Sequence, residues 1–245
     1  MIVSHQHKYL FIALPRTGST AVSKELMANY GGERILRKHS FFHEFQNMMN
    51  SKGNEYFVFS CIRNPLDDVV STYFKFKTDH AKEFSEAKNV KRSSLKRFEF
   101  IRNNNEFPAF LRKYYKVPYD NWSSLEHKKF DFVIKYENIQ NDFKKALELI
   151  GIEQKRPIPV INKTSAKGNF LSYYPPEIQA YAKYVFGTFM KRWGYEFPAE
   201  WSDEPVPISA EMLYRILRLP RKGYWLYIQH STSTFANIFK RIIGR

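Results

Sequence analysis

The residues of this sequence that are best suited to chemistry gather in short polar stretches that directly follow apolar runs. The first stretch combines an arginine, a glycine and three hydroxyl side chains, and it comprises Pro15, Arg16, Thr17, Gly18, Ser19 and Thr20. Gly18 lets the backbone approach a phosphate closely, Arg16 adds a fixed positive charge, and the hydroxyl groups add donors. At the start of a helix, unpaired N–H groups and the helix dipole also attract an anion. The stretch predicts a phosphate loop, with an ordinary strand–helix turn as the alternative.

A second basic position follows the apolar run 55–62. Arg63 comes directly after this run, and Ser71 follows eight residues later. On a helix, at about 100° per residue, Ser71 lies about 130° from the centre of the apolar stripe 66–74 and is therefore not a core position. If the two apolar runs are neighbouring strands, Arg63 and Ser71 point into the crevice beside Gly18. The alternative is that Arg63 caps a helix and Ser71 is a solvated serine.

The phosphate loop lacks the partners of a magnesium-dependent nucleoside triphosphatase. No glycine precedes it at the required spacing, and no lysine follows Gly18. The run 55–62 ends in Arg63 rather than in an aspartate that would hold magnesium. The histidines show no paired spacing with carboxylates, and the single cysteine, Cys61, is expected in the core. The sequence therefore predicts a phosphate site without a metal.

Apolar patterns place these stretches between strands and helices. Continuous apolar runs predict buried strands at 8–14, 55–62 and 130–135, and 34–38 reads as a short strand. Helical spacing of apolar residues predicts helices at 19–30, 41–50, 65–77, 140–150 and 175–193. This alternation predicts a three-layer α/β fold, in which a central parallel sheet carries helices on both faces. Such sheets bind ligands at the carboxyl ends of their strands.

Two of the stretches resemble the nucleotide-binding motifs of sulfotransferases that use 3′-phosphoadenosine 5′-phosphosulfate (PAPS). Pro15–Thr20 resembles the loop around the 5′-phosphosulfate, and Cys61–Ser71 resembles the 3′-phosphate motif, including its interval from arginine to serine. The likeness extends loosely to Lys135–Asn138 and Gly194–Tyr195, so it covers about 8–197. Two motifs in the right order are much more specific than either one.

The resemblance implies a carbohydrate-type sulfotransferase with a fold like that of P-loop-containing nucleotide hydrolases. PAPS would be the co-substrate, 3′-phosphoadenosine 5′-phosphate (PAP) the product, and no metal would take part. The implied nucleotide-binding residues are Arg16, Thr17, Gly18, Ser19, Thr20, Ala21, Arg63 and Ser71. A basic, glycine-containing loop late in related chains makes Lys167 and Gly168 further candidates, with a plain surface loop as the alternative.

A base must take the proton of the acceptor hydroxyl, and histidine suits this role near neutral pH. Members that this chain resembles place a catalytic histidine or glutamate after the first helix, which selects His39. Lys38 and Arg16 would assist by their positive charge at the sulfuryl group. His43 and Glu44 are the fallback bases, and a structural histidine is the alternative for each histidine.

The charge and the aromatic residues bear on the acceptor. The chain carries 39 Lys and Arg against 24 Asp and Glu, a net charge of +15, which attracts nucleotides, acidic glycans, anionic lipids or nucleic acids. Many cytosolic sulfotransferases have lysine where this chain has Arg16, whereas arginine is familiar in carbohydrate sulfotransferases, so a saccharide or acidic glycan is expected. Aromatic residues that would suit such an acceptor are Tyr73, Tyr114, Tyr115, Tyr119, Trp122, Tyr173 and Tyr174. A basic nucleic-acid-binding module without catalysis and a metal-dependent phosphotransferase are the alternative functions.

We expect a sulfotransferase domain at 1–198 and a basic helical extension at 199–245, in which 200–207 is a linker. Within the extension, Met212 and Ile216 belong to a helical apolar pattern among arginines, which predicts packing on the domain or contact with a membrane or an acidic polymer. The charged segment 79–97 is expected to be a mobile loop or the helical edge of a lid. Apolar runs are too short to span a bilayer, and one cysteine suits a reducing compartment, so we expect a cytoplasmic protein. The sequence leaves the oligomeric state open.

Overall fold

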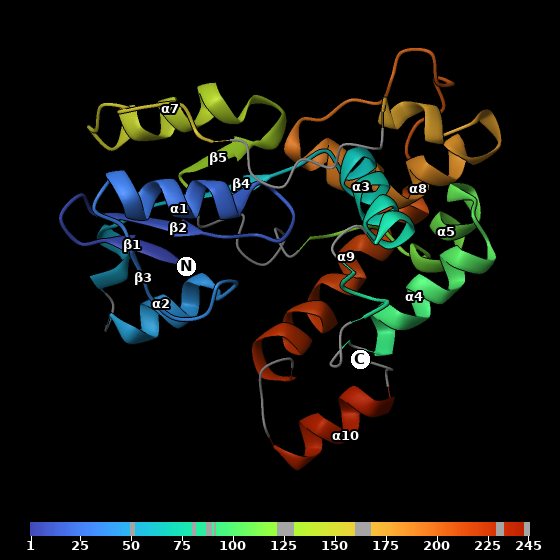
Figure 1. The fold of residues 1–245 in the computed structure, drawn as a ribbon, viewed down its shortest axis with the longest axis horizontal. Coiled ribbons are helices and arrows are strands. Elements are labelled where there is room, and N and C mark those ends of the chain that lie inside the picture. The colour runs from blue at the N-terminus through green and yellow to red at the C-terminus, as the bar shows by residue number, and fades with distance from the viewer. Residues whose placement is uncertain are drawn as a thin grey trace. The chain divides into compact units, whose positions relative to one another are not determined.

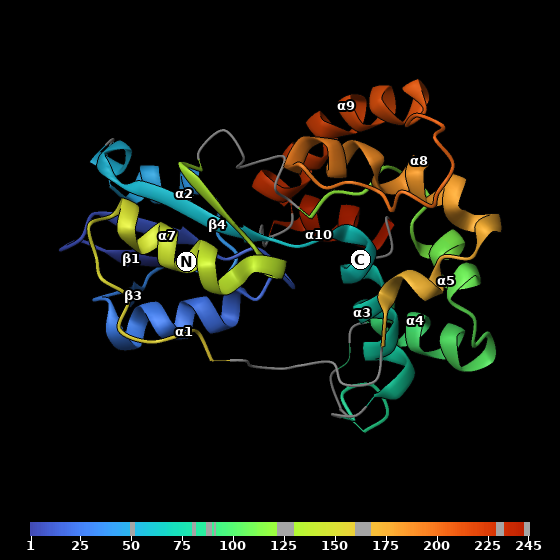
Figure 2. The ribbon, with the colours of Figure 1, turned by 90° about the horizontal axis from the view of Figure 1, so that it is seen from above.

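The computed structural model describes residues 1–49, 52–79, 82–86, 90, 92–121, 130–159, 168–228 and 233–242. They form two compact units, each with its own core (Figures 1 and 2). Unit 1 comprises Met1–Asn64 and Asp120–Lys163, and unit 2 comprises Pro65–Tyr119 and Thr164–Arg245. The domain boundary after residue 198 stays a prediction.

Unit 1 is built on a five-stranded mixed sheet with the order β3-β1-β2-β4-β5. Its strands are β1 (Ile2–Ser4), β2 (Tyr9–Ile12), β3 (Glu33–Arg34), β4 (Phe57–Ile62) and β5 (Phe132–Lys135). The three predicted principal strands, β2, β4 and β5, are parallel, whereas β1 runs antiparallel to both β2 and β3. The α/β class is as expected, and β1 and β3 make the sheet mixed. The strand predicted at 34–38 forms only at Glu33–Arg34.

The register brings the ends of β2 and β4 together at one edge of the sheet. Ile12 of β2 pairs with Ser60 of β4, and the Ser60 hydroxyl donates to the Ile12 carbonyl at 2.6 Å. The segments that leave the two strands therefore start side by side, at residues 13 and 63. Cys61 is completely buried in this region, as expected of an apolar free cysteine.

The helices of unit 1 cover both faces of the sheet. They are α1 (Ser19–Asn29), α2 (Phe42–Met48), α7 (Ile139–Leu149), and the short 3-10 helices η1 (Lys52–Glu55) and η3 (Tyr136–Asn138). Val22 of α1 and Phe143 of α7 pack in one core with Phe59 of β4. Figure 1 shows α2 on the other side of the sheet from α1, and Figure 2 shows the same separation. Unit 1 is therefore a three-layer α/β/α structure.

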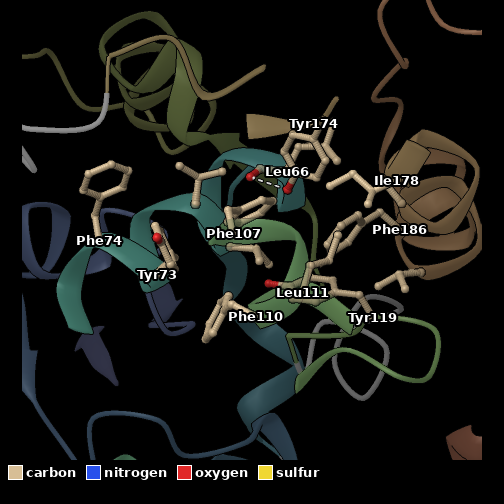
Figure 3. Close-up of a cluster of buried hydrophobic side chains, with 14 of the residues drawn as sticks. Leu66, Tyr73, Phe74, Phe107, Phe110, Leu111, Tyr119, Tyr174, Ile178 and Phe186 are labelled. Atoms are coloured by element: carbon tan, nitrogen blue, oxygen red, sulfur yellow. Dashed lines mark hydrogen bonds between the residues drawn. The ribbon is translucent and has the colours of Figure 1, made fainter. Parts of the chain in front are cut away.

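Unit 2 is helical around a core that is rich in aromatic side chains. Its elements are α3 (Pro65–Thr78), α4 (Arg92–Asn103), α5 (Phe107–Tyr114), η4 (Phe170–Tyr173), α8 (Pro176–Trp193), α9 (Ile208–Gly223), η5 (Tyr224–Ile228) and α10 (Thr234–Ile242). Figure 3 shows Tyr174, Phe107 and Phe186 meeting in this core, where the Tyr174 hydroxyl donates to the Leu66 carbonyl at 3.0 Å.

One expectation for the aromatic residues of unit 2 was wrong. Tyr73, Tyr119 and Tyr174, expected to recognise an acceptor, are at most 7% exposed and belong to the core. Of the two alternatives for 79–97, a loop or a helical edge, the helical one holds from Arg92, where α4 begins.

Residues 200–207, predicted to be a linker, pack on α8. The Lys183 ammonium donates to the carbonyls of Ser202 and Glu204, and a Cβ at Gly187 would overlap Val206. Across the described parts of the chain, no helix is both long enough and apolar enough to pass through a bilayer.

Candidate functional site

The segment after β2 turns sharply before α1 begins. Arg16 and Gly18 have φ angles of 61° and 76°, both in the left-handed region. Gly18 directly precedes Ser19, the first residue of α1, and its carbonyl accepts the N–H of Ala21 at 2.9 Å. The first N–H groups of α1 have no intrahelical acceptor, and they gather at this turn. The geometry is that of an anion-binding loop at a helix N-terminus.

Two of the three loop hydroxyls stabilise the loop itself. The hydroxyls of Thr17 and Ser19 both donate to the carbonyl of Leu14, at 3.0 and 2.7 Å, and both side chains are buried. This carbonyl lies beyond the end of β2, and a buried carbonyl needs a donor. The sequence predicts instead that these hydroxyls donate to the ligand. The orientation shown here leaves the backbone N–H groups and the nearby cations as the donors that suit an anion.

Lys38, which lies between β3 and α2, contacts the start of α1. Its ammonium group donates to the Thr20 hydroxyl at 3.0 Å, which places a positive charge beside the first turn of α1. The amino group of Met1 donates to the carbonyls of Arg37 and Lys38 at 3.1 and 3.2 Å. These bonds fix the backbone that presents Lys38 and the following residue, His39.

His39 lies against the start of the loop. Its Nδ1 is 2.6 Å from the carbonyl oxygen of Ala13, the first residue after β2. A carbonyl only accepts, so Nδ1 carries the proton and Nε2 is the unprotonated nitrogen of the neutral ring. Burial lowers the pKa of His39 below its ordinary value; the bond to Ala13 opposes this shift, and the charge of Lys38 reinforces it. His39 is thus held as a neutral imidazole with a fixed tautomer.

The fallback base Glu44 is already engaged in structural contacts. Its carboxylate accepts the backbone N–H of Phe41 at 2.7 Å and pairs with the guanidinium of Arg37. Burial alone would raise the pKa of Glu44, but the bonds to Phe41 and Arg37 outweigh it and lower that pKa. His43 stacks on the Phe41 ring at a centroid distance of 6.2 Å. These contacts fit a cap for α2 better than a base.

Arg63 lies beside the Gly18 turn, and Tyr136 of η3 joins the two. The Arg63 guanidinium stands 4.4 Å from the centroid of the Tyr136 ring, and one of its nitrogens is 3.5 Å from the carbonyl oxygen of Arg16. The same ring lies against Gly18, where a Cβ would be 2.9 Å from Tyr136 Cδ2 and from Ile139 Cδ1. The predicted proximity of the Gly18 turn and Arg63 is therefore confirmed.

Tyr136 is a residue of this site for which the sequence predicts no role. Only the family resemblance points to its segment, Lys135–Asn138, because a tyrosine after a strand carries no signal of its own. The next residue, Glu137, accepts the backbone N–H of Asn64 at 2.7 Å. Residues 136 and 137 thus hold both residues that follow β4.

The remaining candidates, Ser71, Lys167 and Gly168, do not belong to the described part of unit 1. Ser71 belongs to α3 in unit 2 and is only 8% exposed, so the expectation that it lies outside the core was wrong: α3 packs against α4, α5, α8 and η4. Lys167 lies outside the described residues. Gly168 belongs to unit 2 and has a φ of 55°, with no atom within 4 Å of a Cβ built on it. The roles of these three residues stay predictions.

The site in unit 1 is cationic. Arg16, Lys38 and Arg63 lie around the Gly18 turn, while the nearby carboxylates of Glu44 and Glu137 are bonded to protein donors. Within the described ranges, no group of three or more histidine, cysteine, aspartate or glutamate side chains is arranged to hold a metal. The donor set suits an anion with more than one charged group.

Comparison with known families gives one finding. The model of the sulfotransferase family matches residues 1–185, about three quarters of the chain. The match includes the Gly18 turn, His39, Arg63 and Tyr136. Comparison with curated proteins gave no match, and comparison with solved structures gave none either.

Proposed function

Because the chain belongs to the sulfotransferase family, we propose that it takes the sulfuryl group from PAPS and transfers it to a hydroxyl of a saccharide. The observation that carries the proposal is the convergence of the Gly18 turn, Arg63 and His39 at one edge of the unit 1 sheet. His39 suits proton transfer, and the Gly18 turn and Arg63 suit an anionic nucleotide.

The chemistry of the donors fits the nucleotide. The α1 N-terminus, Lys38 and Arg16 would receive the 5′-phosphosulfate, because backbone N–H groups and cations bind phosphate oxygens through charge-assisted hydrogen bonds. Arg63 would receive the 3′-phosphate, since its planar guanidinium can donate two parallel bonds. The carboxylates of Glu44 and Glu137 accept backbone N–H groups of the protein, from Phe41 and Asn64.

His39 is proposed as the general base. Its Nε2 would accept the proton of the acceptor hydroxyl while the hydroxyl oxygen forms a bond to sulfur. The bond from sulfur to the 5′-phosphate oxygen breaks in the same transfer, and PAP leaves with the extra negative charge. Lys38 and Arg16 would stabilise that charge. The bond to Ala13 would hold the imidazole in orientation throughout.

Thermal unfolding with added nucleotides tests the proposal. PAP at about 100 times its dissociation constant should stabilise the protein by about 2.7 kcal/mol. ATP with magnesium should do so only weakly. The reverse preference would favour a metal-dependent phosphotransferase, and binding of duplex DNA with no response to PAP would favour a nucleic-acid-binding module.

Arg63→Ala tests the place of the nucleotide. Loss of a charge-assisted hydrogen bond costs about 1.5–3 kcal/mol, so the affinity for PAP should fall about tenfold or more. Arg34→Ala on β3 is the matched control, because it removes the same charge from an exposed position on another strand. Equal losses in both variants would mean that PAP senses only the net charge of the protein.

The acceptor and the compartment are further parts of the proposal. A saccharide, and an acidic glycan in particular, is supported by the net charge of +15 and by arginine at position 16. A cytoplasmic location is supported by the single, buried cysteine.

A further inference from the structure

Helix α9 has two apolar faces, and one of them is exposed. Ala210 and Tyr214 are buried, and α9 contacts α8 within unit 2. A second set of large apolar side chains is 58–76% exposed and comprises Ile208, Met212, Ile216 and Leu219, which we call the α9 stripe. At about 100° per residue, these four positions fall within an arc of about 80°, on the side of the helix away from Ala210 and Tyr214.

The α9 stripe is not explained by the packing of unit 2. A helix that serves one core needs one apolar face, with polar residues on the other. A contiguous exposed apolar patch instead marks an interaction site. Among the described residues, seven of the eleven exposed large apolar side chains lie between Ile208 and Ile238, which include Tyr227 and Phe235 at 75% and 70% exposure. Exposed apolar surface is thus concentrated in the last part of the chain.

Positive charge borders the α9 stripe. On the helix, Arg215, Arg218 and Lys222 lie along one side of the stripe, at about 20–80° from Ile208. The single carboxylate of α9, Glu211, pairs with Lys191 of α8 at 2.8 Å. Arg221 points elsewhere and donates to the carbonyl of Pro118. The stripe is therefore flanked by cations.

We propose that the α9 stripe is a docking surface for the face of an anionic lipid bilayer. An amphipathic helix with a basic border lies in the plane of a membrane interface, with its apolar side chains among the acyl chains and its cations at anionic headgroups. An acidic polymer would use the cations but not the four apolar side chains. A second copy of this chain would present the same cations again rather than the anionic groups that Arg215, Arg218 and Lys222 attract. A bilayer with anionic headgroups would contact both the apolar α9 stripe and the cations beside it.

Flotation of the full chain with lipid vesicles tests this surface. Wild-type protein should bind vesicles made of phosphatidylcholine and phosphatidylserine in equal parts, and bind vesicles of phosphatidylcholine alone at least tenfold less. Met212→Gln with Ile216→Gln should lower binding to the anionic vesicles at least tenfold, and Arg215→Gln with Lys222→Gln should do the same. Leu149→Gln, at an exposed leucine that is 53% accessible on the edge of α7, is the matched control and should bind like wild type.

Each other outcome overturns the proposal. If the cation variant loses binding and the stripe variant keeps it, the surface binds polyanions only. If the stripe variant changes the sedimentation coefficient of the protein but not its vesicle binding, the stripe joins two copies of the chain. If wild type does not float, no membrane docks here. Stabilisation by PAP should be unchanged in both variants, so this test and the test of the sulfotransferase proposal fail independently.

Discussion

The imidazole of His39 is held by its bond to Ala13, and burial lowers its pKa. A general base contributes about 10²–10⁴-fold to a rate. His39→Ala should therefore lower turnover by at least a hundredfold and leave PAP affinity unchanged, as measured by steady-state kinetics and thermal shift. His43→Ala is the control and should keep turnover. Wild-type rates in His39→Ala would pass the role of the base to His43 or Glu44.

The lowered pKa of His39 also sets a pH dependence. With His39 as the proposed base, the neutral ring is the active form, so kcat/KM should stay high as the pH falls through the ordinary value of 6.5 and should drop only below it. The unfolded chain takes up this proton at a higher pH than the folded chain, so the His39 contribution to stability falls as the pH drops below 6.5. Urea unfolding of wild type and His39→Ala at several pH values measures this difference. A rate that falls already above neutral pH would contradict the assignment.

Tyr136 positions Arg63 through its ring rather than through its hydroxyl. A cation–π contact is worth about 0.5–2 kcal/mol, so Tyr136→Ala should weaken PAP binding by about twofold to thirtyfold. Tyr136→Phe keeps the ring 4.4 Å from the guanidinium and should bind PAP like wild type. Isothermal titration with PAP separates the two variants. Equal losses would assign the effect to the hydroxyl, and no loss in either would remove Tyr136 from the positioning of Arg63.

At the scale of elements, the turn between β2 and α1 depends on the absence of a side chain at Gly18. A Cβ there meets both a left-handed φ of 76° and two side-chain atoms at 2.9 Å. Gly18→Ala should therefore destabilise the protein by more than the cost of about 1–2 kcal/mol for the left-handed backbone alone. It should also abolish PAP binding, because the loop must move away from Tyr136.

Gly151→Ala separates the backbone cost of Gly18→Ala from the cost of its clash with neighbouring side chains. Gly151 has a similar φ of 80°, but no atom lies within 4 Å of a Cβ built there. Its substitution should cost only the backbone term in urea unfolding and leave PAP binding intact. The same stability loss in both variants would mean that the neighbours of Gly18 give way without cost.

The strand–loop–helix units of the site could be predicted because each has a local cause. Continuous apolar runs make β2 and β4, and Gly18 and Pro65 mark where the next helices begin. The antiparallel strand β1 has three residues, too few to show a period. The inward turn of Thr17 depends on the Leu14 carbonyl, which only the folded loop reveals. Long-range contacts, such as that of Tyr136 with Arg63, have no local signal at all.

At the scale of the whole molecule, the net charge of +15 is distributed far beyond the site. Such a field steers anions toward the protein but does not choose among them, and salt screens it over about 10 Å at 0.1 M. The site adds selectivity, because there the cations are fixed around one turn in unit 1. The long-range field of the net charge and the fixed cations of the site should therefore respond differently to ionic strength.

This difference gives a test of the acceptor class. If the field guides an acidic glycan, kcat/KM for an acidic oligosaccharide should fall several-fold as salt rises from about 0.05 to 0.5 M, since the screening length shortens over this range. The value for a neutral oligosaccharide of the same length should change much less, because only the anionic PAPS feels the field in that reaction. The two acceptors should be compared at saturating PAPS, so that loss of nucleotide binding does not contribute. Equal salt dependence would mean that the acceptor carries no charge that the protein recognises, and a higher kcat/KM for the neutral acceptor at every salt concentration would exclude acidic glycans as the preferred class.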